Sequence, residues 1–335
     1  MKATLKQIAE ETGLSISTVS RVVTGRGYVS EETSALVNAA IQKFEYVKRE
    51  RRAVSLHDND DLVMILIGGI RSSLAAEDVE MLIRELEKKQ KRPFVAITSF
   101  SPERERSYLK FAADNHFFGV IALTIQEEPE TLSLLRNISC PVTMLERYLP
   151  SMELDYLRPD HYKMGFAGAE YLLQHGHRHI GFIGGSATST TTQDKKMGFE
   201  DCMRAYGAEI RPEWIIHVDR LIYENGRPIA QHLLSMPERP TAILCSNDIS
   251  VSILDELLAQ GVRVPKDMSI FTCEDSSLAA HCQVPLTCMR IDYQRISVDA
   301  VKTLFRRQRQ PNSPRRMLVY NPQLVERNSV APPAK

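Results

Sequence analysis

Short apolar runs alternate with amphipathic stretches over most of the chain. Runs typical of buried strands lie at residues 62–67, 94–98, 120–123, 142–145, 179–183, 242–245 and 268–273. Apolar positions recur with helical spacing in several of the segments between them, at residues 78–89, 164–175, 196–206 and 249–260. Strands that alternate with helices predict right-handed βαβ units and doubly wound parallel sheets.

Part of this pattern occurs twice. Residues 64–69 and residues 179–185 each end an apolar run in paired glycines, and a Ser-containing loop follows both. The chain of 335 residues is long enough for two such sheets and a smaller domain, at ~100–200 residues per domain. Two similar lobes would leave a cleft at the carboxyl ends of their strands, which is where sheets of this kind bind ligands.

The first part of the chain has helical spacing and no strand pattern. A Gly-containing turn separates residues 5–11 from a second amphipathic segment that begins near residue 15. Gly13 is placed to supply the left-handed turn residue, and Ser15 or Ser17 to cap the second helix. Two short helices joined in this way predict a helix-turn-helix.

The second predicted helix turns a polar face outward. This face consists of Ile16, Ser17, Thr18, Ser20 and Arg21. Small hydroxyl groups suit hydrogen bonds to phosphates or base edges, and Arg suits guanine or phosphate. The pattern favours a recognition helix for the major groove of DNA, and a pair of ordinary surface helices is the alternative.

Composition narrows the class of protein. Lys and Arg equal Asp and Glu at 42 each, so only local charge can indicate a nucleic-acid partner; residues 1–52 hold nine basic and six acidic side chains. No signal segment is recognisable, and the longest apolar run falls far short of the ~20 residues of a membrane helix. Six cysteines without a CxxC motif favour free thiols. We therefore expect a cytoplasmic protein with no membrane partner.

The N-terminal pattern belongs to a longer resemblance. Residues 4–23, TLKQIAEETGLSISTVSRVV, and residues 28–33, YVSEET, resemble the headpiece of the lactose/galactose repressor (LacI/GalR) family of bacterial transcription regulators. Further segments resemble the family in the same order: GHRHIGFIGG at 176–185, RPTAILCSND at 239–248, GVRVPKDMSI at 261–270, and PLT at 285–287 followed by MR at 289–290. The resemblance covers essentially the whole chain.

The resemblance implies an α/β architecture in which an all-α helix-turn-helix headpiece precedes two doubly wound parallel-sheet lobes of the periplasmic-binding-protein type. It implies a headpiece at residues 1–47, a hinge or linker at 48–61, and an effector-binding and dimerisation domain at 62–335. Within that domain the N-lobe would take about residues 62–160 and 291–318, and the C-lobe about residues 161–290 and 319–330.

The resemblance also implies a homodimer, in which each headpiece reads one half of a pseudo-palindromic, double-stranded operator. Ile16 and Ser17 would read bases, with Ile16 meeting a thymine methyl group, and Arg21 would contact a base or the backbone. Four further positions would hold the headpiece on phosphates: Thr4, Thr18, Ser20 and Tyr28.

The linker departs from the family pattern. Members carry Pro and Asn after the aromatic residue that ends the third helix, and then a Leu that wedges into the minor groove. Here a basic run follows Tyr46, and Ser55 stands at the usual Leu position. Either the hinge is shifted by one residue, with Val54 or Leu56 as the wedge, or the linker is a basic tether that holds phosphates without kinking the duplex.

The family's effector contacts map onto residues that follow predicted strands. These residues are Glu146, Arg147, Asn247, Asp248, Glu274 and Asp275, and Lys195 stands where many members place an Arg. Carboxylate, amide and cationic groups match the hydroxyls of a polyhydroxylated ligand. The segment Cys273-Glu-Asp replaces the family's aromatic-Asp-Asp, so the glycan site is expected to be reshaped.

Three cations, Arg71, Arg147 and Lys195, fall at loops expected to face the cleft. A neutral sugar needs fewer, so we hypothesise an acidic carbohydrate such as an aldonate, a uronate or a sugar phosphate. The alternative is that Glu146, Glu274 and Asp275 neutralise these cations.

Together these features predict a transcription regulator, by family default a repressor of carbohydrate metabolism genes, controlled by a small carbohydrate or sugar-acid effector. A sugar-binding or sensor protein without operator-specific DNA binding is the alternative, and the headpiece argues against it. An enzyme is disfavoured because GxGxxG, GxxxxGK[ST] and GxSxG motifs are absent, and no cofactor is expected. His175, His177 and His179 could form a metal site, but a polar loop that leads into a strand is commoner.

Overall fold

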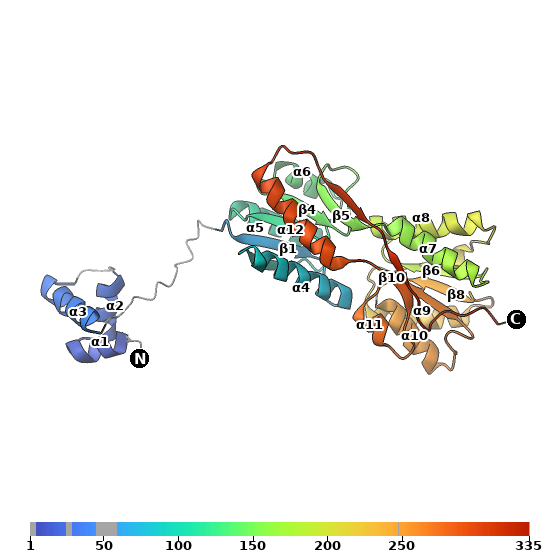
Figure 1. The fold of residues 1–335 in the computed structure, drawn as a ribbon, viewed down its shortest axis with the longest axis horizontal. Helices are drawn as coiled ribbons and strands as arrows, with labels where there is room; N and C mark the ends of the chain where they lie inside the picture. The colour runs from blue at the N-terminus through green and yellow to red at the C-terminus, as the bar shows by residue number, and fades with distance from the viewer. Residues whose placement is uncertain (1–4, 25–28, 45–58, 247, 335) are drawn as a thin grey trace. The chain divides into compact units, whose positions relative to one another are not determined.

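The computed structural model describes residues 5–24, 29–44, 59–246 and 248–334 (Figure 1). The chain divides into two compact units, Met1–Ser55 and Leu56–Lys335. Five residues with a predicted role lie outside the described residues, and their roles stay predictions: Thr4, Tyr28, Val54, Leu56 and Asn247. Within the described ranges, every helix is too short or too polar to cross a membrane.

Three helices form the first unit around a small apolar core. They are α1 (Leu5–Thr12), α2 (Ile16–Thr24) and α3 (Glu31–Lys43). Each helix contributes one fully buried side chain to the core, namely Ile8, Val19 and Val37. Gly13 follows α1 with a φ of +69°, a conformation that L side chains rarely adopt, and so turns the chain into α2 as the sequence predicts.

The second unit contains two sheets, and the first sheet is parallel throughout. Its strands, from edge to edge, are β11 (Met317–Tyr320), β5 (Asp155–Pro159), β4 (Val142–Leu145), β3 (Gly119–Ala122), β1 (Leu62–Ile67) and β2 (Arg92–Ile97). Its helices are α4 (Ser73–Lys88), α5 (Pro102–Asp114), α6 (Pro129–Asn137) and α12 (Tyr293–Arg309). We call this sheet and its helices the N-lobe.

Side chains of β1 point alternately to the two faces of the N-lobe sheet. Val63 and Ile65 pack in the core that includes residues of α4 and α12, whereas Met64 and Leu66 pack in the core that includes residues of α5 and α6. Both faces of the strand are apolar because a parallel sheet is covered by helices on both sides. A continuous apolar run is therefore the correct sequence signal for this strand.

The second sheet repeats the plan. Its strands, from edge to edge, are β12 (Gln323–Val325), β10 (Thr287–Arg290), β9 (Ser269–Thr272), β8 (Ala242–Cys245), β6 (Ile180–Gly184) and β7 (Ile215–His217), and β12 alone runs antiparallel to its neighbour. Its helices are α7 (His161–Gln174), α8 (Thr190–Ala205), α9 (Gly226–Ser235), α10 (Ile249–Ala259) and α11 (Ser277–His281), with short 3-10 turns at Pro212–Trp214 and Tyr223–Asn225. We call this sheet and its helices the C-lobe.

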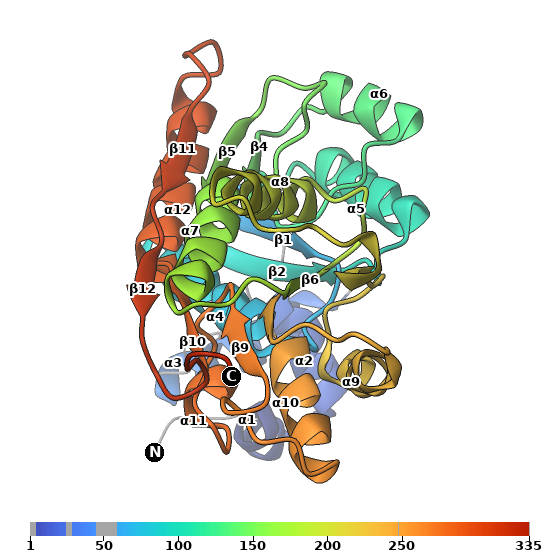
Figure 2. The same cartoon turned by 90° about the vertical axis from the view of Figure 1, so that its right-hand side faces the viewer.

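The chain passes between the two lobes three times. It crosses from β5 to α7, from β10 to α12, and from β11 to β12, and Figure 2 shows β11 continuing into β12 along one side of the unit. Because β5 and β10 cross directly from their carboxyl ends, the carboxyl ends of the parallel strands lie where the lobes meet. The predicted architecture of a helical headpiece and two doubly wound lobes is confirmed.

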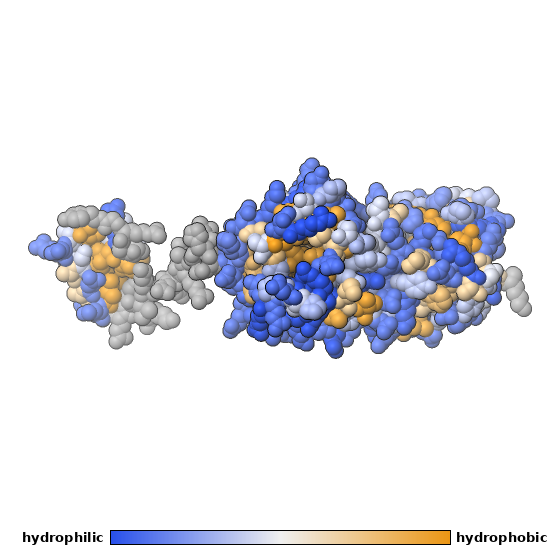
Figure 3. Space-filling view, turned by 90° about the horizontal axis from the view of Figure 1, so that it is seen from above, coloured by the Kyte–Doolittle hydropathy of each residue, from blue (hydrophilic) through white to orange (hydrophobic). Residues whose placement is uncertain are grey.

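The surface of the second unit is mainly polar, and the histidine cluster has a structural place. The face in Figure 3 is mostly hydrophilic with scattered apolar areas.

His177 is fully buried, and its two ring nitrogens lie 2.9 Å from Thr241 Oγ1 and 2.9 Å from the carbonyl oxygen of Ala331. Burial lowers the pKa of His177 to about 4. This neutral ring ties the C-terminal segment to the C-lobe, and the described residues hold no group of three metal-ligating side chains.

Two glycines allow α7 and α8 to approach each other closely. A Cβ atom at Gly165 would lie 1.9 Å from the carbonyl oxygen of Lys195, and one at Gly198 would lie 2.0 Å from the carbonyl oxygen of Tyr162. Contacts this short with backbone atoms would force the helices apart. The packing therefore fixes the position of the Lys195 backbone, whose side chain enters the cleft described below.

We predict that Gly165→Ala destabilises the protein by roughly 1–3 kcal/mol, the usual cost of overpacking, despite the better helix propensity of Ala. Urea unfolding measures the change. Gly69→Ala is the control, because a Cβ atom there would lie 3.6 Å from a side-chain atom of Phe100, an ordinary van der Waals distance. Equal stability of the two variants would contradict this account of the α7–α8 packing.

Candidate functional site

The exposed start of α2 gathers hydroxyl groups. Ser15 Oγ accepts a hydrogen bond from the amide of Thr18 at 3.1 Å, which identifies Ser15 as the cap. The same oxygen lies 2.9 Å from Thr18 Oγ1 and 2.7 Å from Ser17 Oγ. Amide and hydroxyl donors at a helix N-terminus attract anionic oxygens, including those of phosphates.

The face of α2 that the sequence assigns to DNA is accessible in the headpiece. Ile16 is 51% exposed, Ser17 and Arg21 are exposed, and Thr18 and Ser20 are half-buried. Val19, in the same helix, is fully buried and holds α2 against the other two helices. The helix thus presents an apolar side chain, hydroxyls and a guanidinium group, which are the kinds of group that read base edges and phosphates.

A second group of polar residues lies inside the larger unit, where strands end. Lys195 of α8 forms an ion pair with Glu274, which follows β9, and both side chains are more than nine-tenths buried. Burial alone would lower the pKa of Lys195, but Glu274 and other acidic neighbours raise that pKa above its ordinary value. The lysine therefore stays charged and is committed to its partner.

Glu146 follows β4 in a left-handed conformation, with a φ of +66°. Side chains other than Gly, Asn and Asp rarely occupy this region, and residues held there concentrate at functional sites. The carboxylate lies 3.8 Å from His161 Nε2, which also lies 3.0 Å from the backbone carbonyl oxygen of Glu146. Burial raises the pKa of Glu146 to about 7 against the opposing charge of Lys195. Burial, followed by Lys195, also lowers the pKa of His161 well below its ordinary value, so the ring is neutral.

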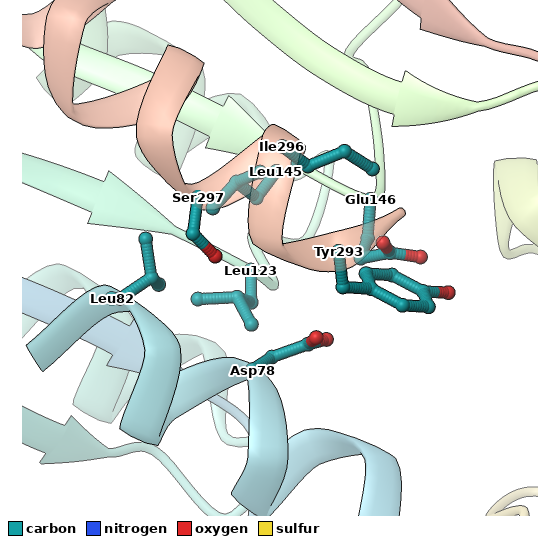
Figure 4. A pocket seen from close by; sticks show the side chains of 8 residues that line it. All are labelled: Asp78, Leu82, Leu123, Leu145, Glu146, Tyr293, Ile296 and Ser297. Atoms are coloured by element: carbon teal, nitrogen blue, oxygen red, sulfur yellow. The ribbon is translucent and has the colours of Figure 1, made fainter. Parts of the chain in front are cut away.

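An enclosed cavity of about 10 Å³ lies beside Glu146 in the N-lobe. Figure 4 shows the polar groups of Asp78, Glu146 and Tyr293 at one side of this cavity, with Ser297 and apolar side chains around the rest. Asp78 comes from α4 and Tyr293 from the start of α12. The apolar lining is formed by Leu82, Leu123, Leu145 and Ile296.

Several buried polar atoms at this place have no hydrogen-bond partner among the described residues. They are Asp78 Oδ1, Glu146 Oε1, Tyr293 Oη and His161 Nδ1. Leaving such groups unsatisfied costs free energy, so native proteins seldom do it without a functional or structural reason. Their concentration in one place makes this cleft the candidate site for a polar ligand.

Contacts between the lobes flank this cleft. Ser73, at the first turn of α4 in the N-lobe, donates its amide to Asp248 Oδ2 at 2.6 Å and its hydroxyl to Asp248 Oδ1 at 2.7 Å. Asp248 precedes α10 in the C-lobe and is buried. A second contact joins Arg158 of β5 to Asp194 of α8 at 2.9 Å. The two lobes are therefore held together by charge-assisted hydrogen bonds.

The other residues predicted from the sequence take different places. Arg71 is exposed and forms an ion pair with Glu224, and Asp275 pairs with Arg290 and Arg327 on the side of β10 and β12. The structure thus brings neither of them to the Lys195–Glu274 pair. Arg147 is half-buried; burial lowers its pKa, and the charges of Glu105 and Glu146 oppose that effect.

Sequence reasoning missed Asp78, His161 and Tyr293. A signal for Asp78 was present, because it lies four residues after Leu74 and four before Leu82, both buried, on the apolar side of α4. A carboxylate in an apolar stripe is seldom buried without a charged partner or a function. His161 and Tyr293 each begin a helix just after a crossover, and the sequence alone does not place them opposite β4.

Residues 4–48 match the family described as bacterial regulatory proteins, lacI family, and residues 169–330 match a periplasmic binding protein-like domain. The chain belongs to the LacI/GalR family of bacterial transcription regulators. The HTH-type transcriptional repressor PurR of Pasteurella multocida (strain Pm70) is 27% identical over 98% of both chains. The HTH-type transcriptional regulator DegA of Bacillus subtilis (strain 168) is 26% identical over 99% of both chains. The protein is accordingly a DNA-binding transcription repressor of this family and not an enzyme.

Solved structures of LacI-type regulators share the fold. The structure titled transcriptional regulator CelR-cellobiose complex has a TM-score of 0.74 at 23% identity, covering 98% of this chain and 100% of the other. The lac repressor dimer bound to operator and the anti-inducer ONPF has a TM-score of 0.74 at 18% identity, covering 99% of this chain and 100% of the other. Headpiece and lobes are thus both found in regulators of known structure.

We predict that Ser73→Ala removes one hydrogen bond to a buried carboxylate and costs about 1.5 kcal/mol, in the range for bonds to charged groups. The amide at position 73 lies in the first turn of α4, where it has no intrahelical acceptor. Its hydrogen exchange therefore reports contact with Asp248 directly, and we expect exchange to quicken in the variant. Ser72→Ala is the matched control, since the described residues offer Ser72 Oγ no partner. Unchanged exchange in Ser73→Ala would contradict the importance of this contact.

We predict that Glu146→Gln stabilises the protein more at pH 8 than at pH 5, by roughly 3 °C or more in Tm. The folded-state pKa of about 7 exceeds the ordinary value of 4.5. Between those pH values the folded chain keeps a proton that the unfolded chain releases, so this group lowers stability as pH rises. Thermal unfolding across pH 5–8 checks the difference. Glu153→Gln, an exposed site, should change neither value, and a pH-independent effect of Glu146→Gln would count against the buried carboxyl.

Proposed function

We propose that the protein acts as a homodimer in the cytoplasm, reads a pseudo-palindromic operator through α2, and changes its operator affinity when a small polar effector binds between the lobes. The observation that carries the proposal is the accessible face of α2 in a headpiece that matches the LacI family. A dimer suits such an operator, because two related headpieces meet two related half-sites.

The exposure and chemistry of the α2 side chains support different DNA contacts for different residues. Ile16 and Ser17, at the start of the helix, would contact base edges, with Ile16 against a thymine methyl group. Arg21 would contact a base or a phosphate one turn later. Thr18 and Ser20, together with Thr4 and Tyr28, would hold the headpiece on phosphates, and Val54 or Leu56 would enter the minor groove if the linker forms a hinge.

For the effector, we propose a small carbohydrate-like molecule that contacts the Lys195–Glu274 pair, with Asn247, Asp248 and Arg147 close to it. The solved regulator titled as a cellobiose complex supports a carbohydrate as the ligand class, and the regulated genes would then serve carbohydrate metabolism. An acidic carbohydrate has less support than the sequence suggested. Arg71 and Lys195, two of the three cations behind that hypothesis, are already paired with carboxylates.

Regulation requires that the effector and the operator prefer different arrangements of the lobes. Coupling of this kind is typically ~1–3 kcal/mol, and it is reciprocal, so operator DNA must change effector affinity by the same factor. The contacts of Ser73 with Asp248 and of Arg158 with Asp194 are among the described bonds that a change in lobe arrangement would break, as are those of Arg71 with Glu224 and Ser277 with Glu77. A sugar sensor that does not bind operator DNA would have no use for the exposed α2 face.

We predict that Ile16→Ala lowers affinity for the selected operator by about tenfold or more and relaxes the preference at one base pair in each half-site, since an apolar base contact is lost. Selection from a random duplex library, repeated at two salt concentrations, measures both changes. Asn38→Ala, exposed on α3, is the control and should leave the consensus intact. If the wild-type protein binds DNA without any consensus sequence, the headpiece contacts phosphates only. This result would refute the proposed reading of an operator.

A further inference from the structure

The corner of the cleft formed by Asp78, Glu146 and Tyr293 contains buried oxygens that accept or donate no hydrogen bond among the described residues. Asp78 is 6% exposed and Tyr293 is 9% exposed, and both line the enclosed cavity. One oxygen of each, and Glu146 Oε1, has no partner among the described residues. Figure 4 shows that these side chains come from three elements, α4, α12 and the end of β4, and that their polar ends lie on the same side of the cavity.

The charges around Asp78 are negative. The groups that act on it are Glu146 and Glu77, and they add to burial in raising the pKa of Asp78 well above its ordinary value. Lys195, whose charge acts on Glu146, forms an ion pair with Glu274, and Arg147 interacts with both Glu105 and Glu146. His161 is neutral because burial lowers its pKa. The protein therefore places two carboxyl groups together, and neither forms an ion pair with a Lys or Arg in the described part of the chain.

A ligand must complement this arrangement. The raised pKa values mean that the corner by itself favours protonated carboxyl groups, whereas a cationic ligand would favour their ionised form, which only accepts hydrogen bonds from the ligand. A hydroxyl donates a single hydrogen bond and leaves the repulsion between the carboxylates in place. An ammonium group donates three hydrogen bonds and carries the opposite charge, and charge-assisted bonds are about twice as strong as neutral ones. An anionic ligand would add a further negative charge to the corner.

The size of the cavity also favours an ammonium group. About 10 Å³ is close to the space of one water-sized group, which an ammonium group also is. Leu82, Leu123 and Ile296 give this space an apolar wall, and the ring of Tyr293 adds an aromatic surface. An apolar and aromatic wall suits the C–H faces of a sugar ring or a carbon chain and strengthens the case for a cation close to the aromatic ring.

We propose that the effector carries a primary amine, as an amino sugar does, and that its ammonium group binds between Asp78, Glu146 and Tyr293. This inference rests on the proposed function, because it assigns a ligand class to the same cleft. The rest of the ligand extends from the corner toward the Lys195–Glu274 pair. The inference replaces the acidic carbohydrate with a cationic one.

Four probes built on the same six-carbon skeleton test the proposal on the full-length protein: glucosamine, N-acetylglucosamine, glucose and gluconate. Titration calorimetry and thermal shift measure binding without DNA. We expect glucosamine to bind at least about tenfold more tightly than the other three, since only it offers an ammonium group. We also expect Asp78→Asn to remove this preference while it raises Tm, because a buried charge without a partner is lost. Glu80→Gln, an exposed carboxylate on the same helix, should keep the preference.

Two results overturn the inference: equal or tighter binding of glucose, N-acetylglucosamine or gluconate, and failure of the protonated amine to bind at all. A preference for glucosamine that survives Asp78→Asn overturns the assigned position as well. Operator affinity, measured in parallel by fluorescence anisotropy with each probe, separates this inference from the proposed function. Amine binding that depends on Asp78 but leaves operator affinity unchanged supports the ligand class and refutes the regulation. Operator affinity that responds to gluconate alone supports regulation and refutes the ligand class.

Discussion

The burial of Lys195 against Glu274, where the two sheets meet, determines much of the cleft's character. A charge taken out of water is tolerated only when it is paired, so this lysine cannot serve a second carboxylate without weakening its bond to the first. Burial raises the pKa values of Glu146 and Asp78, the charge of Lys195 offsets only part of this effect at Glu146, and each carboxyl group keeps one oxygen that no described residue satisfies. The glycines of α7 and α8 belong to the same arrangement, because they let the Lys195 backbone lie against α7.

The fold could be predicted from the sequence wherever an element carries its own signal. The bounds of β1, β4 and β8 agree with the predicted runs because each is a continuous apolar segment that helices cover on both faces. The edge strands β11 and β12 escaped prediction because their side chains are half-buried or exposed and their pairing partners are distant in sequence. The start of α4 was placed five residues late, since Ser72 and Ser73 resemble a loop until Asp248 is seen to accept from Ser73.

The candidate site could be predicted only in part, for a related reason. Strand ends are visible in a sequence, and they located Glu146 and Glu274 at the meeting of the lobes. The pairing of charges is not visible, because it joins residues far apart in the chain: Arg71 with Glu224, and Asp275 with Arg327. The hypothesis of an acidic ligand came from counting cations, whereas the ligand would meet only those side chains that the protein leaves unpaired. Asp78, which lies on the buried face of α4, adds an unpaired carboxyl group, so the unpaired side chains that a ligand would meet are acidic and not basic.

The same geometry constrains how an effector can act. A ligand that binds two arrangements of the lobes equally well shifts nothing, however tightly it binds. With the lobes held by the bonds of Ser73 to Asp248 and Arg158 to Asp194, the space beside Glu146 is about 10 Å³, enough for one small group and too little for a sugar ring. The proposed ligand would place only its ammonium group in the corner, and its ring would lie in the space between the lobes, where Arg71, Ser73 and Asp248 line a cavity of about 470 Å³. The free energy that such a ligand contributes to any change of the lobes is limited by what Asp78 and Glu146 gain from a partner that the described residues do not provide.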